Sequence, residues 1–271
     1  MDANMWEKLT IQKIFTSLFM VTLILALIAC GCGGKCEEKE GCFQTSVIVQ
    51  NLYQESLVFR AFYKAEGKKI PECICWVQDT NLSEDLPAVT NPNENKTVLK
   101  RIPPRVDDDF IIAHELCTYI VAKDGFPGTQ PIPDKWNPNI ALISGQLNSM
   151  VWTPLRDRIL SKYGFNLEKQ YKAYRDVLLK KPYPGSALDA LDSVFLYAQI
   201  VLYWEDVLHK TQPTDWQKQF DEQYPEIADY GRTVLGKIRE FGYDTPEKMS
   251  LLFLDLINWS HLEGAVELER R

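Results

Sequence analysis

The chain has 271 residues, of which 45% are hydrophobic and 11% aromatic, so it can bury a sizeable core as one large domain or a domain with appendages. Its formal net charge is −7 and its basic residues are scattered, which argues against a surface that follows nucleic-acid phosphates. The seven cysteines are an odd number, so we expect one of them to serve something other than a disulfide.

The first residues have the organisation of a signal peptide. A short polar start carries Lys8 and Lys13, and residues 14–29 are then almost wholly apolar and uncharged. This apolar run is shorter than the roughly 20 residues that a bilayer-spanning helix needs. The alternative is an uncleaved N-terminal anchor helix.

The run ends at Leu27-Ile28-Ala29-Cys30, which resembles the lipobox of bacterial lipoproteins. The resemblance implies cleavage before Cys30, acylation of this cysteine (palmitate among the chains), and export to a bacterial membrane, the outer membrane if the host has one. Several acyl chains anchor stably where one does not. We therefore divide the chain into a signal peptide (1–29), a lipidated flexible tether (30–44) and a single domain (45–271).

Most cysteines lie near this tether. The spacing of Cys32, Cys36 and Cys42 matches no standard zinc motif, so we expect disulfides or further tether chemistry there. In an exported protein, one of Cys73 and Cys75 is expected to pair with another cysteine, and the pairing is left open. The cysteines concerned are Cys32, Cys36, Cys42, Cys73 and Cys75.

Before the centre of the chain, β-forming residues predict strands at 45–50, 57–63 and 70–77. Residues 79–96 are rich in Asn, Asp, Glu and Pro and predict a long surface loop.

The central prediction is a helix that begins in the acidic run 107–109 and ends near Lys123, with Gly125 as its stop. At about 100° per residue, Ile112 and Leu116 lie on one face. His114, Glu115 and Thr118 lie together on a roughly opposite face.

Beyond this helix the chain is predicted to be helical, which makes the fold α+β: a small N-terminal sheet followed by a predominantly helical half. Pro154 is expected to kink or break its helix. Turn and cap residues delimit helices at 140–162, 167–180, 186–209, 214–223 and 226–240, followed by a final helix opened by Pro246.

The central helix resembles the active-site helix of zincin-type metallopeptidases. His114-Glu115-Leu116-Cys117-Thr118 follows the His-Glu-x-x-His pattern, in which two histidines bind zinc and the glutamate activates the bound water. The resemblance implies a zincin-like fold, with His114 as a metal ligand and Glu115 as the catalytic residue if the site is active. Thr118 replaces the second histidine, so the metal site is expected to be degenerate.

Other residues are weaker candidates for the missing ligand. Cys117 is one turn from His114, although a packed core cysteine is the simpler interpretation. Asp157 could supply a carboxylate or form a salt bridge with a neighbouring arginine. Glu205 and His209 form an i,i+4 pair, equally compatible with a surface ion pair, and His261 is expected to be peripheral.

Three functions remain open. The first is a membrane-anchored envelope lipoprotein whose domain has lost peptidase activity, holds no cofactor, and binds or scaffolds a peptide or protein partner. The second is an active metallopeptidase that holds zinc through a non-standard ligand set. The third is a purely structural helical lipoprotein, which an exposed apolar patch on the last helices would favour.

Overall fold

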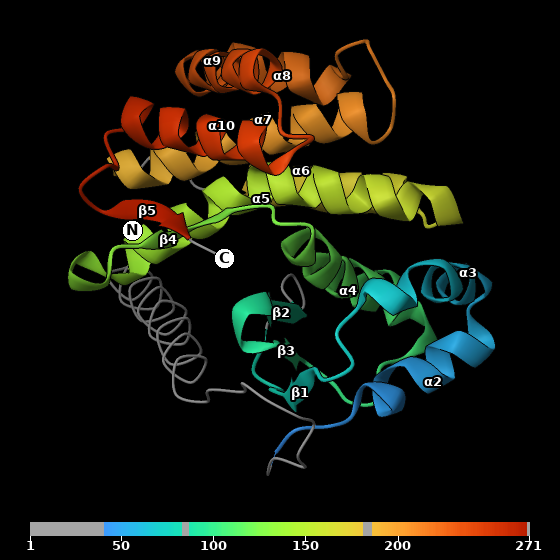
Figure 1. Ribbon diagram of the computed structural model, residues 1–271. Coiled ribbons are helices and arrows are strands. Elements are labelled where there is room, and N and C mark those ends of the chain that lie inside the picture. Colours follow the sequence, from blue (N-terminus) through green and yellow to red (C-terminus); the bar gives the residue numbers. More distant parts are fainter. Residues whose placement is uncertain (1–40, 83–86, 181–185, 270–271) are drawn as a thin grey trace, which may run out of the picture.

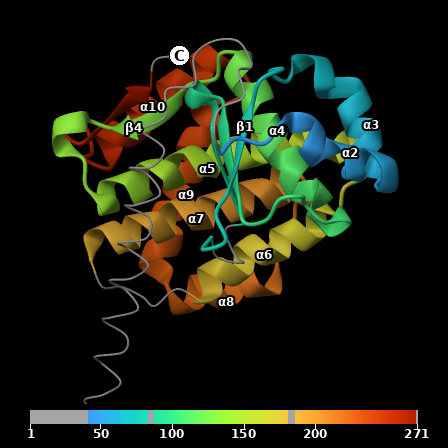
Figure 2. The same cartoon turned by 90° about the horizontal axis from the view of Figure 1, so that it is seen from below.

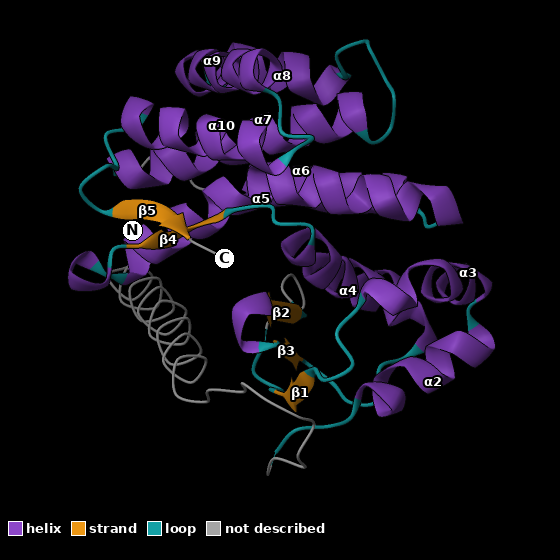
Figure 3. Ribbon diagram, in the orientation of Figure 1, coloured by secondary structure: helices purple, strands orange, loops and turns teal. Residues whose placement is uncertain are grey.

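The computed structural model describes residues 41–82, 87–180 and 186–269 (Figure 1). The predicted signal peptide, the lipidation site Cys30 and the first part of the predicted tether (30–40) lie outside these residues. Within them the fold is α+β, with strands in two small sheets among many helices (Figure 3).

The N-terminal region contains two helices where strands are predicted at 45–50 and 57–63. These helices are α2 (Thr45–Glu55) and α3 (Leu57–Glu66), followed by the short 3-10 helix η1 (Gly67–Lys69). Phe59 and Phe62 are fully buried one turn apart, which is a helical spacing. The strand predictions were wrong because β-branched and aromatic residues also suit a helix face that tertiary packing buries.

The larger sheet has the order β1-β3-β2, with β1 parallel and β2 antiparallel to β3. The strand predicted at 70–77 is confirmed only in its last part, and the predicted loop 79–96 contains β2 and the start of β3. The elements are β1 (Cys75–Gln78), β2 (Ala88–Asn91), η2 (Pro92–Glu94) and β3 (Lys96–Leu99).

A disulfide fastens the start of the described chain to this sheet. Cys42 is bonded to Cys75 at the beginning of β1, and Cys73 is disulfide-bonded as well. The Phe43 backbone N–H donates to the Trp76 carbonyl over 2.8 Å. The last residues of the predicted tether are thus held against β1.

The central helix is confirmed as α4 (Asp109–Lys123), preceded by η3 (Val106–Asp108). Gly125 follows with a φ of +83°, a left-handed conformation that suits glycine at a helix end. The helix is buried on nearly all sides, Glu115 and Thr118 included, rather than on one face only.

The helical half is confirmed with small changes of boundary. The elements are β4 (Gly128–Pro131), η4 (Pro133–Lys135), α5 (Pro138–Leu160), η5 (Ser161–Tyr163), α6 (Leu167–Lys180), α7 (Ala187–Asp206), α8 (Asp215–Gln223), α9 (Pro225–Phe241) and α10 (Pro246–Trp259). Pro154 lies inside α5 and does not break it. Gly164 and Asn166 lie between η5 and α6, where Gly164 has a positive φ and Asn166 accepts from the Lys169 backbone N–H.

Helices α5 and α7 form the centre of the molecule. Helix α7 packs between α5 and α9, and α5 also contacts α4 (Figures 1 and 2). The C-terminal strand β5 (Val266–Glu269), which the sequence did not predict, pairs antiparallel with β4. No helix among the described residues is both long and apolar enough to span a bilayer.

Candidate functional site

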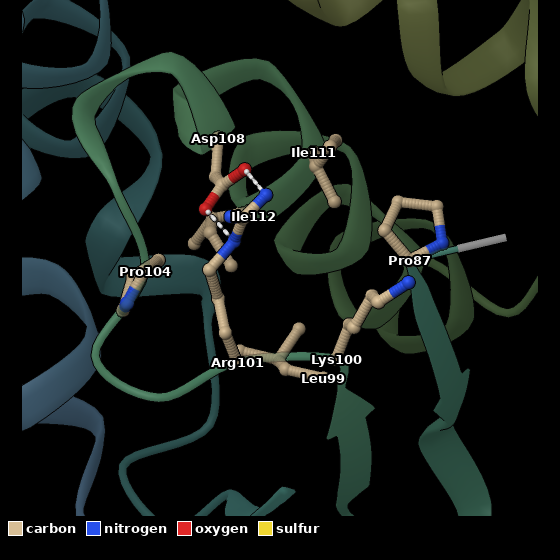
Figure 4. Close-up of a pocket in the computed structure, with 8 residues that line it drawn as sticks. All are labelled: Pro87, Leu99, Lys100, Arg101, Pro104, Asp108, Ile111 and Ile112. Atoms are coloured by element: carbon tan, nitrogen blue, oxygen red, sulfur yellow. Dashed lines mark hydrogen bonds and ion pairs between the residues drawn. The ribbon is translucent and has the colours of Figure 1, made fainter. Parts of the chain in front are cut away.

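The start of α4 is fixed by the segment that precedes it. Asp108 accepts a hydrogen bond from the Arg105 backbone N–H at 2.8 Å and pairs with the Arg101 guanidinium at 3.0 Å. Figure 4 shows this pair beside a cavity of about 10 Å³, near the size of one water. This arrangement positions the helix that carries His114, and the cavity is too small for a larger ligand.

His114 is joined to a buried acid on the neighbouring helix. Its Nδ1 lies 2.6 Å from Oδ1 of Asp157 on α5, and Asp157 has no exposed surface. The other oxygen, Oδ2, accepts a hydrogen bond from the Tyr203 hydroxyl on α7 at 2.8 Å. Because an ionised carboxylate only accepts, Nδ1 is the donor in this contact, and Nε2 is the ring nitrogen that Asp157 does not contact.

A second tyrosine adjoins this chain of hydrogen bonds. Tyr174 on α6 packs edge to face against Tyr203, with ring centroids 5.5 Å apart. Burial, together with the negative charge of Asp157, raises the pKa of both hydroxyls far above the ordinary tyrosine value. Both therefore stay protonated at neutral pH, and Tyr203 remains a donor to Asp157.

The position of the second zincin histidine is occupied by a hydroxyl bound to an arginine. Nη1 of Arg156 donates to Oγ1 of Thr118 at 2.7 Å, and Nη2 donates to Thr153 at 3.2 Å. A guanidinium at this place repels a divalent cation, and it cannot be deprotonated to become a ligand. The residues around His114 therefore do not fit a zinc ion.

The remaining candidates on α4 do not complete a metal centre. Glu115 is 8% exposed, and no described residue forms a hydrogen bond or ion pair with it. Cys117 is a free, fully buried cysteine, and burial raises the pKa of its thiol well above the usual value, so it is a packed core residue rather than a thiolate ligand. Across the described ranges, no group of at least three His, Cys, Asp or Glu residues is arranged to hold a metal.

The i,i+4 pairing predicted for Glu205 and His209 is wrong. Helix α7 ends at Asp206, and His209 has a φ of +54° beyond it, so the two residues do not share a helix face. Glu205 instead pairs with Arg239 on α9 at 2.7 Å. His261 is exposed in the turn after α10, at the periphery as predicted.

Chemically, the site consists of the His114 imidazole, oriented by Asp157, with no nucleophilic side chain of the described residues hydrogen-bonded to it. A His–Asp pair can act as a general base when a nucleophile lies against the free nitrogen. The hydrogen bonds in the described part of the chain place no hydroxyl or thiol on Nε2, and only 12% of the His114 side chain is exposed. A more open pocket, of about 340 Å³, lies elsewhere, between α6, α7 and α8.

The sequence pointed to His114 and Asp157 separately but not to their contact, and it missed Tyr203 and Tyr174. For Tyr203 the available signal was a tyrosine within the largely apolar helix α7, since a buried hydroxyl needs a partner. Tyr174 lies on the charged helix α6, which carries no such signal. Comparison with known proteins adds no further assignment: no protein family, curated protein or solved structure matches this chain.

Proposed function

We propose that this chain is a lipid-anchored protein of the bacterial cell envelope whose domain binds a partner and does not cleave peptides. The contact between Arg156 and Thr118 carries the second part of the proposal, because it sets a fixed positive charge where a zincin would hold its metal. Asp157 is likewise occupied on both oxygens, by His114 and Tyr203.

The anchoring part of the proposal is supported by the lipobox-like Leu27-Ile28-Ala29-Cys30 and by the disulfides. The Cys42–Cys75 bond and the bonded state of Cys73 suit an oxidising compartment outside the cytoplasm. Kinship with zincins remains part of the proposal as well. It is supported by α4 lying against the larger sheet, where the Tyr119 and Thr97 hydroxyls are 2.8 Å apart.

Metal content tests the loss of the zinc site. We expect the purified chain to hold far less than one equivalent of zinc after dialysis. Thr118→His alone should not raise this content, because Arg156 still lies at the site. Stoichiometric zinc that survives dialysis and is lost in His114→Ala would overturn the proposal and favour the metallopeptidase.

The fate of Cys30 tests the anchor. In a bacterial host, Cys30→Ala should abolish incorporation of labelled palmitate and release the protein from the membrane fraction. Cys32→Ala serves as the matched control and should keep both properties. A Cys30→Ala protein that still carries the label would refute lipidation at this cysteine.

A purely structural role is the second candidate, and exposed apolar side chains favour it. Leu251 and Leu254 lie one turn apart on α10 and are 56% and 52% exposed. If they support self-association, the wild-type chain should exceed monomer mass in light scattering and Leu251→Glu should restore the monomer. A wild-type monomer at all concentrations would leave the binding role as the better account.

A further inference from the structure

The pocket between α6, the end of α7 and the start of α8 has an aromatic floor. Its volume is about 340 Å³, within the range of small-molecule sites, and Tyr171, Trp204 and Trp216 line it. Tyr171 is buried, whereas both tryptophans are half-buried, so their rings are partly open to solvent.

Hydrogen bonds hold these rings in place. Trp204 packs on Tyr171 with ring centroids 4.9 Å apart, and its Nε1 donates to the Gln212 carbonyl at 2.9 Å. Nε1 of Trp216 donates to the Tyr171 hydroxyl at 2.6 Å. Both indole N–H groups are thus used within the protein. The rings therefore offer apolar faces rather than donors, and a ligand does not have to order them.

The rim of the pocket is charged but balanced. Glu168 and Asp215 supply two acids, and Lys172 and Arg175 supply two bases. One charge of each sign is already paired outside the pocket, Arg175 with Asp176 at 2.6 Å and Asp215 with Lys218 at 3.8 Å, so the remaining pair, Glu168 and Lys172, is still balanced. A strongly anionic ligand would meet the two carboxylates, and a cationic one would meet the two bases. This rim instead suits an uncharged ligand with many hydroxyl groups, which both carboxylates and cationic donors can hydrogen-bond.

We propose that this pocket binds a neutral saccharide, with a sugar ring lying on the aromatic floor and its hydroxyl groups on the charged rim. A sugar ring combines an apolar C–H face with a polar edge, which are the two surfaces that the pocket presents. This inference rests on the proposed function in one point only, that the domain binds a partner, and it names the chemical class of that partner. It requires neither the lipid anchor nor the absence of zinc.

Calorimetric titration of the detergent-solubilised full chain tests the proposal. The probes are maltose, cellobiose and N,N′-diacetylchitobiose, with choline and benzoate as charged comparators. We expect saturable binding of at least one disaccharide, a change in tryptophan emission on binding, and weaker or no binding of the charged probes. Saturable binding only of choline or benzoate would overturn the proposal.

Retention on insoluble chitin or cellulose distinguishes a polymeric glycan from a free sugar as the ligand. Retention on a polymer without detectable disaccharide binding supports a polymeric glycan. Disaccharide binding without retention supports a free sugar. Failure of both overturns the saccharide site and leaves the Cys30 result, and with it the anchor, untouched.

Variants locate the binding in this pocket. Trp216→Leu should weaken binding roughly tenfold, as the loss of a stacking ring implies, whereas Trp136→Leu, outside the pocket, should not. Because Trp216→Leu disturbs packing, the exposed rim residue provides a second test. Lys172→Ala should weaken binding several-fold, and Lys169→Ala, one turn away on α6 and also exposed, should not. Binding that neither Trp216→Leu nor Lys172→Ala weakens would overturn the assignment.

Discussion

Asp157 is the residue on which the interior polar network depends. It has no exposed surface and takes hydrogen bonds from two other helices, through His114 on α4 and Tyr203 on α7. A buried carboxylate is tolerated only when its oxygens are satisfied. In this protein the hydrogen bonds that satisfy Asp157 also connect α4, α5 and α7, which are separated in the sequence.

Replacing Asp157 by alanine should therefore be costly. The change leaves the His114 ring and the Tyr203 hydroxyl without their partner, and we expect the free energy of unfolding to fall by about 3 kcal/mol. Asp134→Ala, at an exposed aspartate in η4, should change it by less than about 0.5 kcal/mol. Urea denaturation of both variants measures the difference, and equal midpoints would show that the network contributes little.

The contact between His114 and Asp157 also marks the limit of sequence reasoning at this scale. Each residue could be selected from its neighbours along the chain. Their pairing depends on how α4 and α5 cross, which no local pattern encodes. The same holds for Arg156, whose partner Thr118 lies on the other helix.

At the scale of elements, local signals predicted best where both ends of a helix are encoded nearby. Helix α6 (Leu167–Lys180) coincides with its prediction because Gly164 ends the preceding segment with a φ of +88° and Asn166 accepts from the Lys169 backbone N–H. Strand β5 was missed because β4, with which it pairs, lies far away in the sequence. Whether this segment pairs as a strand depends on tertiary contacts, which the local sequence pattern does not encode.

The contact between α7 and α9 depends on a glycine. A Cβ at Gly231 would overlap the ring of Tyr197, which is fully buried and hydrogen-bonded to Asp221 at 2.7 Å and so cannot move aside. Although alanine favours a helix, we expect Gly231→Ala to lower the free energy of unfolding by about 1–3 kcal/mol.

Gly236 on the same helix gives the matched control. A Cβ there meets nothing within 4 Å, so Gly236→Ala should raise the free energy of unfolding by about 0.5–1 kcal/mol. Thermal and urea unfolding of the two variants compare them directly. A stabilising effect at both positions would mean that α7 and α9 do not pack as closely as described.

At the scale of the whole molecule, the Cys42–Cys75 disulfide joins the beginning of the domain to its sheet. It closes a loop with a sequence separation of 33. We expect the double variant Cys42→Ser/Cys75→Ser to lose about 3–4 kcal/mol of unfolding free energy, by the usual loop-entropy relation. Dithiothreitol should destabilise this variant further, because Cys73 is bonded separately. An unchanged urea midpoint in the double variant would contradict the structural role of the bond.

Several tyrosines whose hydroxyl groups are shielded from water, on different parts of the chain, give the whole fold a shared response to alkaline pH. Burial is the main cause that raises the pKa of Tyr119, Tyr174, Tyr203 and Tyr243 above the ordinary value of 10.0. Above this value the unfolded chain releases protons that the folded chain retains. The stability that these groups contribute is therefore fully present below pH 10 and is lost as pH rises toward the folded-state pKa values.

We expect the free energy of unfolding to begin to fall near pH 9, where the unfolded chain ionises Cys117 while burial keeps this thiol protonated in the folded chain. Above pH 10 it should fall by about a further 1.4 kcal/mol per pH unit for each such tyrosine. Tyr203→Phe should make this decline shallower, because the contribution of one tyrosine to the slope is removed. It should also lower stability at pH 8, since Asp157 loses a donor. Tyr230→Phe, at a side chain that is 57% exposed, should keep the wild-type slope. Urea unfolding at intervals of half a pH unit measures all three proteins, and parallel curves for Tyr203→Phe and the wild type would show that Tyr203 is not shielded from water as the fold implies.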